Sequence, residues 1–158
     1  MKIIVDISDA RVSNCSEDEL VTYSLGSCIG VALYDRERHM GGMLHFQLPA
    51  SAENAARAKE RPFMYADTGM EWLINELVTR GATKKRLAAK IAGGAQMMND
   101  ATMFNIGKRN HTAIRRILWK HGMFIDGEDI GGNSARNLTL RLQDGVVTVK
   151  SQGQERPL

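Results

Sequence analysis

The sequence predicts a single α+β domain in which mixed or antiparallel sheets carry two main helices on one face. Strand patterns fill the first third of the chain. Two amphipathic helical patterns with a short apolar strand between them occupy the middle, and strand patterns close the chain. This grouping of strands and helices is typical of α+β folds. The chain has 158 residues, the length of one ordinary domain, so we expect one domain over residues 1–158.

Composition is that of an ordinary soluble protein. Hydrophobic residues make up 43% and charged residues 25%, and the net charge of +3 comes from 21 basic and 18 acidic side chains. No apolar run approaches the roughly 18 residues of a membrane span, and the first residues lack a signal-peptide pattern. Aromatic residues are 6%, few for a basic surface with stacking rings. We therefore expect a cytoplasmic protein with no membrane insertion and no nucleic-acid partner.

Two strands are expected before residue 26. Residues 2–8 form a β-branched run, and residues 19–25 alternate with the period of a strand, with a polar loop at 13–18 between them. By that period one face of the second strand carries Leu20, Thr22 and Ser24, and the other carries Val21, Tyr23 and Leu25.

A hairpin is expected next, with strands at residues 29–34 and 42–48 and a charged loop at 35–40. If its turn centres on Glu37 and Arg38, Gly30 faces His45 across the two strands.

This register determines whether a cysteine and a histidine can meet. Cys28 has the same strand parity as Gly30, so Cys28 and His45 would share a face as diagonal neighbours. A shift of one residue would place His45 opposite Ile29 and on the wrong face for that contact.

Helical periodicity predicts two helices. The first begins at residue 67 or 68 and stops at Gly81, with Met70, Leu73, Ile74, Leu77 and Val78 inward. The second runs from residue 107 or 108 to 121 and stops at Gly122, with Ile114, Ile117 and Leu118 inward.

The remaining segments are shorter. Residues 50–66 suggest a loop with one helical turn, which we expect to form a rim for substrate, and residues 87–92 and 123–130 suggest strands. The secondary structure of residues 96–104 is ambiguous from the sequence. The final pattern is a hairpin over residues 138–149, with a two-residue turn at Asp144 and Gly145, followed by a frayed end at residues 153–158.

Cys28 is the strongest candidate for chemistry. Without an export signal, Cys15 and Cys28 are expected to be reduced thiols. A lone cysteine with a histidine elsewhere in an intracellular chain fits a nucleophile, and the flanking residues Gly26, Ser27 and Gly30 are the ones expected to meet a substrate. The alternative is a buried cysteine that serves as a small hydrophobic residue.

His45 would then act as the general base toward Cys28 and as the acid toward the leaving group. Thr22 could orient the imidazole or steer the substrate. On pattern alone, a core histidine bonded to a carbonyl and an ordinary strand threonine remain alternatives.

Other features of the sequence are weaker signals of function. The four histidines show no metal-ligand spacing with either cysteine, so we expect no metal and no cofactor. The glycine pairs at 93–94 and 131–132 fit plain turns better than phosphate loops. The basic side of the second helix is a solvated face or a docking site for an acidic helical partner.

Several ordered motifs resemble the CheD family of chemoreceptor glutamine deamidases. The motifs are Leu25-Gly26-Ser27-Cys28, Gly41-Gly42-Met43-Leu44-His45-Phe46-Gln47-Leu48-Pro49, Tyr65-Ala66-Asp67, Ala92-Gly93-Gly94-Ala95, Ile106-Gly107-Lys108-Arg109-Asn110 and Asp129-Ile130-Gly131-Gly132. The spacing of Thr22, Cys28 and His45 is similar to that family's Cys-His-Thr triad. The chain departs from the family pattern at Ala135-Arg136-Asn137, where Gly-Arg-Lys is expected, and at Gln47, where an apolar residue is more usual.

The resemblance implies hydrolysis of receptor glutamine amides to glutamate, with release of ammonia, through a thioester on Cys28. It also implies a layered α/β sandwich related to the deamidating-toxin fold. Expected partners are the cytoplasmic helices of chemoreceptors, the phosphatase CheC and, through CheC, phosphorylated CheY. Methyl-ester hydrolysis is a second activity that the resemblance suggests.

Two other functions fit the same residues. A non-enzymatic chemotaxis adaptor would use the groove to bind a receptor or CheC and would keep its function in Cys28→Ala. An unrelated thiol hydrolase or peptidase would cleave backbone or ester bonds instead.

Overall fold

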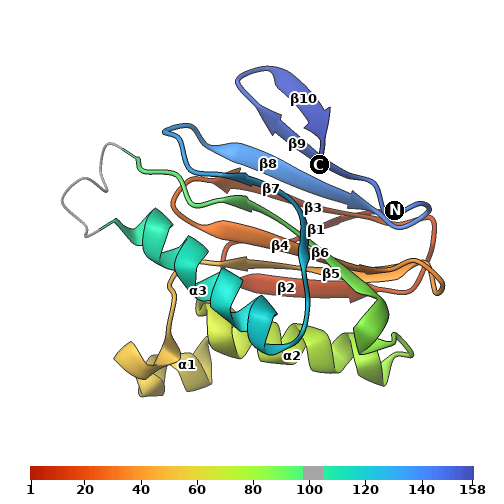
Figure 1. Cartoon of the computed structure of the whole chain (residues 1–158), viewed down its shortest axis with the longest axis horizontal. Helices are drawn as coiled ribbons and strands as arrows, with labels where there is room; N and C mark the ends of the chain where they lie inside the picture. Colours follow the sequence, from red (N-terminus) through yellow and green to blue (C-terminus); the bar gives the residue numbers. More distant parts are fainter. Residues whose placement is uncertain (98–104) are drawn as a thin grey trace.

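The computed structural model describes residues 1–97 and 105–158, which form three layers: an outer sheet, a central sheet and a layer of helices (Figure 1). The outer sheet has the strand order β1 (Lys2–Ile4), β3 (Glu19–Leu25), β8 (Arg136–Arg141), β9 (Val147–Ser151) and β10 (Gln154–Pro157). The central sheet has the order β2 (Asp9–Ser13), β5 (Met40–Phe46), β4 (Ile29–Asp35), β6 (Leu87–Gly93) and β7 (Ile125–Ile130). Both sheets are mixed, because β1 pairs with β3 and β6 with β7 in parallel.

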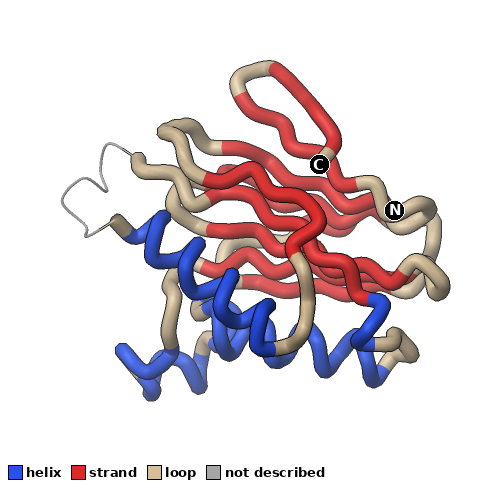
Figure 2. Tube along the Cα trace, viewed as in Figure 1, coloured by secondary structure: helices blue, strands red, loops and turns tan. Residues whose placement is uncertain are grey.

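The helices cover one face of the central sheet (Figure 2). The α-helices are α1 (Ala55–Glu60), α2 (Ala66–Thr79) and α3 (Ile106–Lys120), and the 3-10 turns are η1 (Ser51–Glu53), η2 (Pro62–Met64) and η3 (Lys84–Arg86). The predicted α+β class, the mixed sheets and the two main helices on one face are thus confirmed.

Two apolar cores follow from this layering. Every residue of β4 is buried, as expected for a strand covered on both faces. Its odd-numbered residues Ile29, Val31 and Leu33 face the helix layer, where they meet Leu73 and Leu118. Its even-numbered residues face the outer sheet.

The central hairpin has the predicted register. Gly30 lies opposite His45 across β4 and β5, and Ile29 lies opposite Phe46. The bounds predicted for β3 are also confirmed.

The predicted faces of β3 are wrong at its end. Ser24 has a φ of 60°, and the β3–β8 register shifts between Thr22 and Leu25. This bulge turns Leu25 inward, so that it joins the same core as Leu20, while Tyr23 is exposed.

One strand was missed and three other predictions are wrong. Strand β2 was not expected, because its residues do not form an apolar run. Val78 is exposed, since α2 turns only Met70, Leu73, Ile74 and Leu77 fully inward. The turn at residues 142–146 is longer than two residues.

The C-terminal residues do not fray, because β10 pairs with β9 and Leu158 N–H donates to Val147 O. Most of the ambiguous segment, at 98–104, lies outside the described residues.

Candidate active site

Cys28 and His45 are brought to the same side of the central sheet. His45 lies on β5 opposite Gly30, and Cys28 comes one residue before β4. The carbonyl of Cys28 accepts from Gly94 N–H at 2.9 Å, so the ladder between β4 and β6 extends to Cys28. The half-buried Cys28 side chain packs against the core between the two sheets, which is the side that His45 faces. The predicted shared face is therefore present.

Gly30 lies where the two sheets pack together. A Cβ on Gly30 would lie 3.0 Å from Leu25, 3.1 Å from Leu138 and 3.3 Å from Thr22. Gly30 is buried, so these side chains from the outer sheet fill the space beside it. The outer sheet therefore covers the position at which a substrate was expected to approach.

Thr22 bonds His45 across the two sheets. Its hydroxyl donates to Val5 O at 2.7 Å and lies 2.7 Å from His45 Nδ1. A hydroxyl has one proton and a carbonyl can only accept, so Nδ1–H donates to Thr22 Oγ1. This assignment leaves Nε2 as the unprotonated, basic nitrogen of His45.

His45 is held as a neutral base. Its side chain is fully buried, and burial lowers its pKa from 6.5 to about 4, although Asp6 and Asp9 oppose this shift through their negative charge. Nε2 is also buried, and among the described residues it has no hydrogen-bond partner. The resting imidazole is thus able to accept a proton from a group that reaches Nε2.

The loop that carries Cys28 is tied to the ends of β6 and β7. Ala95 N–H donates to Gly26 O at 2.8 Å, and Gly131 N–H donates to Gly93 O at 2.9 Å. Gly93 has a φ of 118°, and a Cβ there would lie 2.1 Å from the carbonyl oxygen of Cys28. The glycine pair at 93–94 therefore serves close backbone contact behind the cysteine, whereas Gly131 and Gly132 have positive φ values of 90° and 73°, as in a turn.

Asn137, one of the residues that depart from the family pattern, forms a hydrogen bond beside this site. Asn137 Oδ1 accepts from Ser24 N–H at 3.1 Å, at the bulge that precedes the cysteine loop. Arg136 is buried and bonds Asp129 and the carbonyls of Gly131 and Ser134. Asn137 thus holds the backbone just before the loop, and Arg136 holds the turn that follows β7.

Comparison with known proteins identifies the family. The family model described as CheD chemotactic sensory transduction matches residues 47–151. The chain is 45% identical over 157 residues to a probable chemoreceptor glutamine deamidase CheD of Solibacter usitatus, covering 99% of this chain and 93% of that protein. The chain belongs to the CheD family.

A second relative shares the same name. The probable chemoreceptor glutamine deamidase CheD 1 of Syntrophus aciditrophicus is 46% identical over 151 residues, which are 96% of this chain and 94% of that protein. A solved structure, Neisseria meningitidis protein NMB0706, has a TM-score of 0.43 and 10% identity over 83% of this chain and 63% of its own, a similarity too low to support an argument. Thr22, Cys28 and His45 lie before the segment matched by the CheD family model and within the long matches to the relatives.

Asn110 is the site residue of this CheD-family chain that sequence reasoning missed. It lies on α3 and is fully buried, and its Nδ2 group donates to Ser27 O and to Gln47 O, both at 2.9 Å. Ser27 directly precedes Cys28, and Gln47 comes two residues after His45. One amide therefore joins the two segments at the open end of the β4–β5 ladder. The available signal was the spacing of Asn110 with Ile114 and Leu118, which puts a polar residue on the buried helix face.

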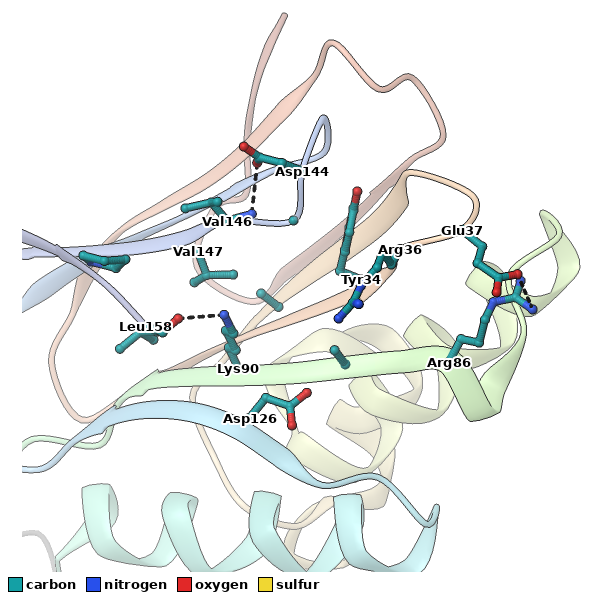
Figure 3. A pocket seen from close by; sticks show the side chains of 14 residues that line it. Tyr34, Arg36, Glu37, Arg86, Lys90, Asp126, Asp144, Val146, Val147 and Leu158 are labelled. Atoms are coloured by element: carbon teal, nitrogen blue, oxygen red, sulfur yellow. Dashed lines mark hydrogen bonds and ion pairs between the residues drawn. The ribbon is translucent and has the colours of Figure 1, made fainter.

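A separate cavity lies at the other end of β4 (Figure 3). It has a volume of about 650 Å³, and its walls include Tyr34, Arg36, Lys90, Asp126 and Leu158. Lys90 Nζ donates to Leu158 O at 2.7 Å across it. None of the three candidate catalytic residues lines this cavity, and its mixed charges favour no ligand class.

Residues 1–97 and 105–158 contain no group of three or more His, Cys, Asp or Glu side chains that could hold a metal ion. No helix in the same ranges is long and apolar enough to cross a membrane.

Proposed function

We propose that this CheD-family chain is a chemoreceptor glutamine deamidase in which Cys28 is the nucleophile, His45 the general base and Thr22 the residue that orients His45. The observation that carries the proposal is the hydrogen-bond chain from His45 Nδ1 through Thr22 to Val5 O, which leaves Nε2 basic on the side of the sheet that Cys28 shares. The names of the relatives supply the substrate class.

The first half of the reaction forms a thioester. His45 Nε2 takes the thiol proton of Cys28, and the sulfur attacks the side-chain amide carbon of the receptor glutamine. The protonated His45 then gives its proton to the amide nitrogen, and the C–N bond breaks with release of ammonia. Because burial disfavours the imidazolium, the imidazolium is a strong acid toward the departing nitrogen.

The second half consumes one water. His45 Nε2 removes a proton from the water, whose oxygen attacks the thioester carbon, and the sulfur leaves and recovers the proton. The products are a glutamate side chain and the free thiol of Cys28. Throughout the cycle Thr22 Oγ1 accepts from Nδ1–H, so the ring keeps one orientation while Nε2 gains and loses its proton.

Asn110 is a positioning residue in this scheme. Its two donated bonds hold the backbone beside the nucleophile at a fixed separation from the backbone beside the base. Its Oδ1 is buried and has no partner among the described residues, an arrangement that costs about 1–3 kcal/mol. Asn110 therefore acts through its two donated bonds.

The partners follow from the family. We propose that the substrates are cytoplasmic helices of chemoreceptors and that the chain acts in the cytoplasm. CheC, and through it phosphorylated CheY, are the further partners that the family resemblance supports.

Mass spectrometry of a receptor fragment tests the activity. Incubation with the wild-type chain should add about one mass unit for each converted glutamine and release an equal amount of ammonia, and Cys28→Ala should abolish both. Cys15→Ala is the matched control and should keep full activity, because Cys15 is exposed and lies outside the site. A mass gain that survives Cys28→Ala, or no gain with the wild-type chain, would contradict the proposal.

A further inference from the structure

Helix α3 carries an unusual concentration of positive charge. Its 15 residues include no acidic side chain and five basic ones, Lys108, Arg109, Arg115, Arg116 and Lys120. The whole chain has a net charge of +3 from 21 basic and 18 acidic residues, so everything outside α3 sums to −2. The basic character of the protein therefore resides in this one helix.

The charge is exposed and little neutralised. All five basic side chains of α3 are exposed, and within the described residues only Arg109 forms an ion pair, with Glu53. Lys108 and Arg109 lie in the first turn, where the helix dipole disfavours cations. Stability of the helix thus does not account for Lys108 and Arg109.

Two aromatic residues extend the same surface. Trp119 in the last turn of α3 is 75% exposed, and Phe124, just beyond the helix, is 76% exposed. They line a shallow hollow with Arg115 and Arg116. Trp and Arg are the residue types most often found to dominate binding energy at protein interfaces.

The surface starts beside the candidate active site. Asn110 on the buried side of α3 bonds Ser27 O, next to Cys28. From there α3 runs along the outside of the molecule to Trp119, so the 15-residue helix presents a track of about 22 Å (Figure 1). A substrate held along this track would have its reacting residue near one end.

We propose that the exposed face of α3, defined by Lys108, Arg109, Thr112, Arg115, Arg116 and Trp119, docks an acidic helical segment of the protein that carries the target glutamine. This proposal rests on the deamidase function proposed above. Charge complementarity selects an acidic partner, and the straight track of exposed side chains fits another helix. The product glutamates would add to the negative charge of such a partner.

The composition of α3 favours a protein over a lipid surface or a nucleic acid. Its apolar residues Ile114 and Leu118 are fully buried in the domain core, so the helix has no free apolar face to enter a bilayer. Trp119 is the only aromatic residue of α3, whereas single-stranded nucleic acids bind to rows of stacking rings.

A binding and kinetic comparison tests the docking surface. The charge reversal Arg115→Glu with Arg116→Glu should raise KM for a chemoreceptor cytoplasmic fragment roughly tenfold and leave kcat unchanged, because neither residue touches the reacting groups. Trp119→Ala should raise KM several-fold. The matched control is Lys2→Glu with Lys85→Glu, which makes the same change in net charge at exposed positions outside α3 and should leave KM unchanged.

Binding without turnover separates this proposal from the deamidase function. In the Cys28→Ala background, the dissociation constant for the fragment should rise on Arg115→Glu/Arg116→Glu and not on Lys2→Glu/Lys85→Glu. If the wild-type chain binds through α3 and produces no glutamate, the deamidase function fails while the docking surface stands. Equal effects of the two double variants would overturn the docking surface. So would a wild-type chain that binds single-stranded DNA or anionic phosphatidylserine vesicles as tightly as the fragment.

Discussion

At the scale of single residues, the candidate site depends on one hydroxyl. Thr22 Oγ1 donates to Val5 O and accepts from His45 Nδ1–H, so a single proton assignment satisfies both bonds. Since Val5 and Thr22 are both fixed by the outer sheet, the tautomer of a histidine on the central sheet is set by the packing of one sheet on the other. This makes Thr22 the residue whose role is easiest to test.

Thr22→Val should lower kcat on the order of 10- to 100-fold, because it removes the acceptor of Nδ1–H and keeps the shape of the side chain. Thr22→Ser keeps the hydroxyl and should retain most of kcat. Both values can be measured by ammonia release from a receptor fragment. Full activity in Thr22→Val would show that the tautomer is set in another way.

The buried His45 should make stability depend on pH. Its folded pKa of about 4 lies below its unfolded value of 6.5, so between these values the unfolded chain binds more protons than the folded one. The free energy of unfolding should therefore fall by about 3 kcal/mol as the pH is lowered from 6.5 to 4. Urea unfolding at several pH values measures this change. His45→Gln should lack this component, and an equal slope in both proteins would contradict the pKa assignment.

At the scale of elements, the site is the open end of a hairpin closed by a helix. The β4–β5 ladder ends at the pair Ile29 and Phe46, and beyond it Asn110 from α3 bonds the backbone of each strand. In the opposite sheet, the bulge at Ser24 in β3 lies just before the loop that carries Cys28. Elements that are distant in sequence thus set the separation between the segments that carry Cys28 and His45.

Asn110→Ala should lower kcat about tenfold or more with little change in KM, because a shift of either strand end misplaces the reacting groups. Ile114→Val is the structural control: it trims the same buried helix face one turn further on and should cost about 0.5–1.5 kcal/mol of stability with normal kcat. Kinetics and urea unfolding of both variants distinguish the cases. Parallel losses of stability with equal kcat would mean that Asn110 only supports the fold.

At the scale of the whole molecule, the central sheet belongs to two cores at once. Strand β4 is buried on both faces, with Leu73 of α2 on one side and Leu138 of β8 on the other. Neither core can be lost without exposing this strand. The three layers should therefore unfold together.

Leu73→Ala and Leu138→Ala should each lower the free energy of unfolding by about 2–5 kcal/mol and keep a single transition. Tryptophan fluorescence, which includes Trp72 on α2, and circular dichroism should give coincident curves. Separate transitions would show that the outer sheet is an independent unit. Leu138→Ala should also reduce kcat, whereas Leu73→Ala should not. The reason is that Leu138 packs beside Gly30 between the sheets.

The fold class could be predicted because it depends on local signals. These signals are the strand and helix periods, the charged hairpin loop and the glycines that end helices, and each acts over a few residues. They predicted the bounds of β3 and the register that places Gly30 opposite His45. Val78, β2 and β10 were missed, because exposure on a helix and pairing at a sheet edge depend on neighbours that local patterns do not specify.

The sequence by itself determined the residue types of the site and the resemblance to the CheD family. The shared face of Cys28 and His45 followed from one of two possible hairpin registers, and the structure has that register. Only the tertiary structure decided the rest. The bond between Thr22 and His45, the inward turn of Leu25 at the bulge and the clamp made by Asn110 all join residues from different layers. Their distances depend on how two sheets and a helix pack together, and that packing is a property of the whole core.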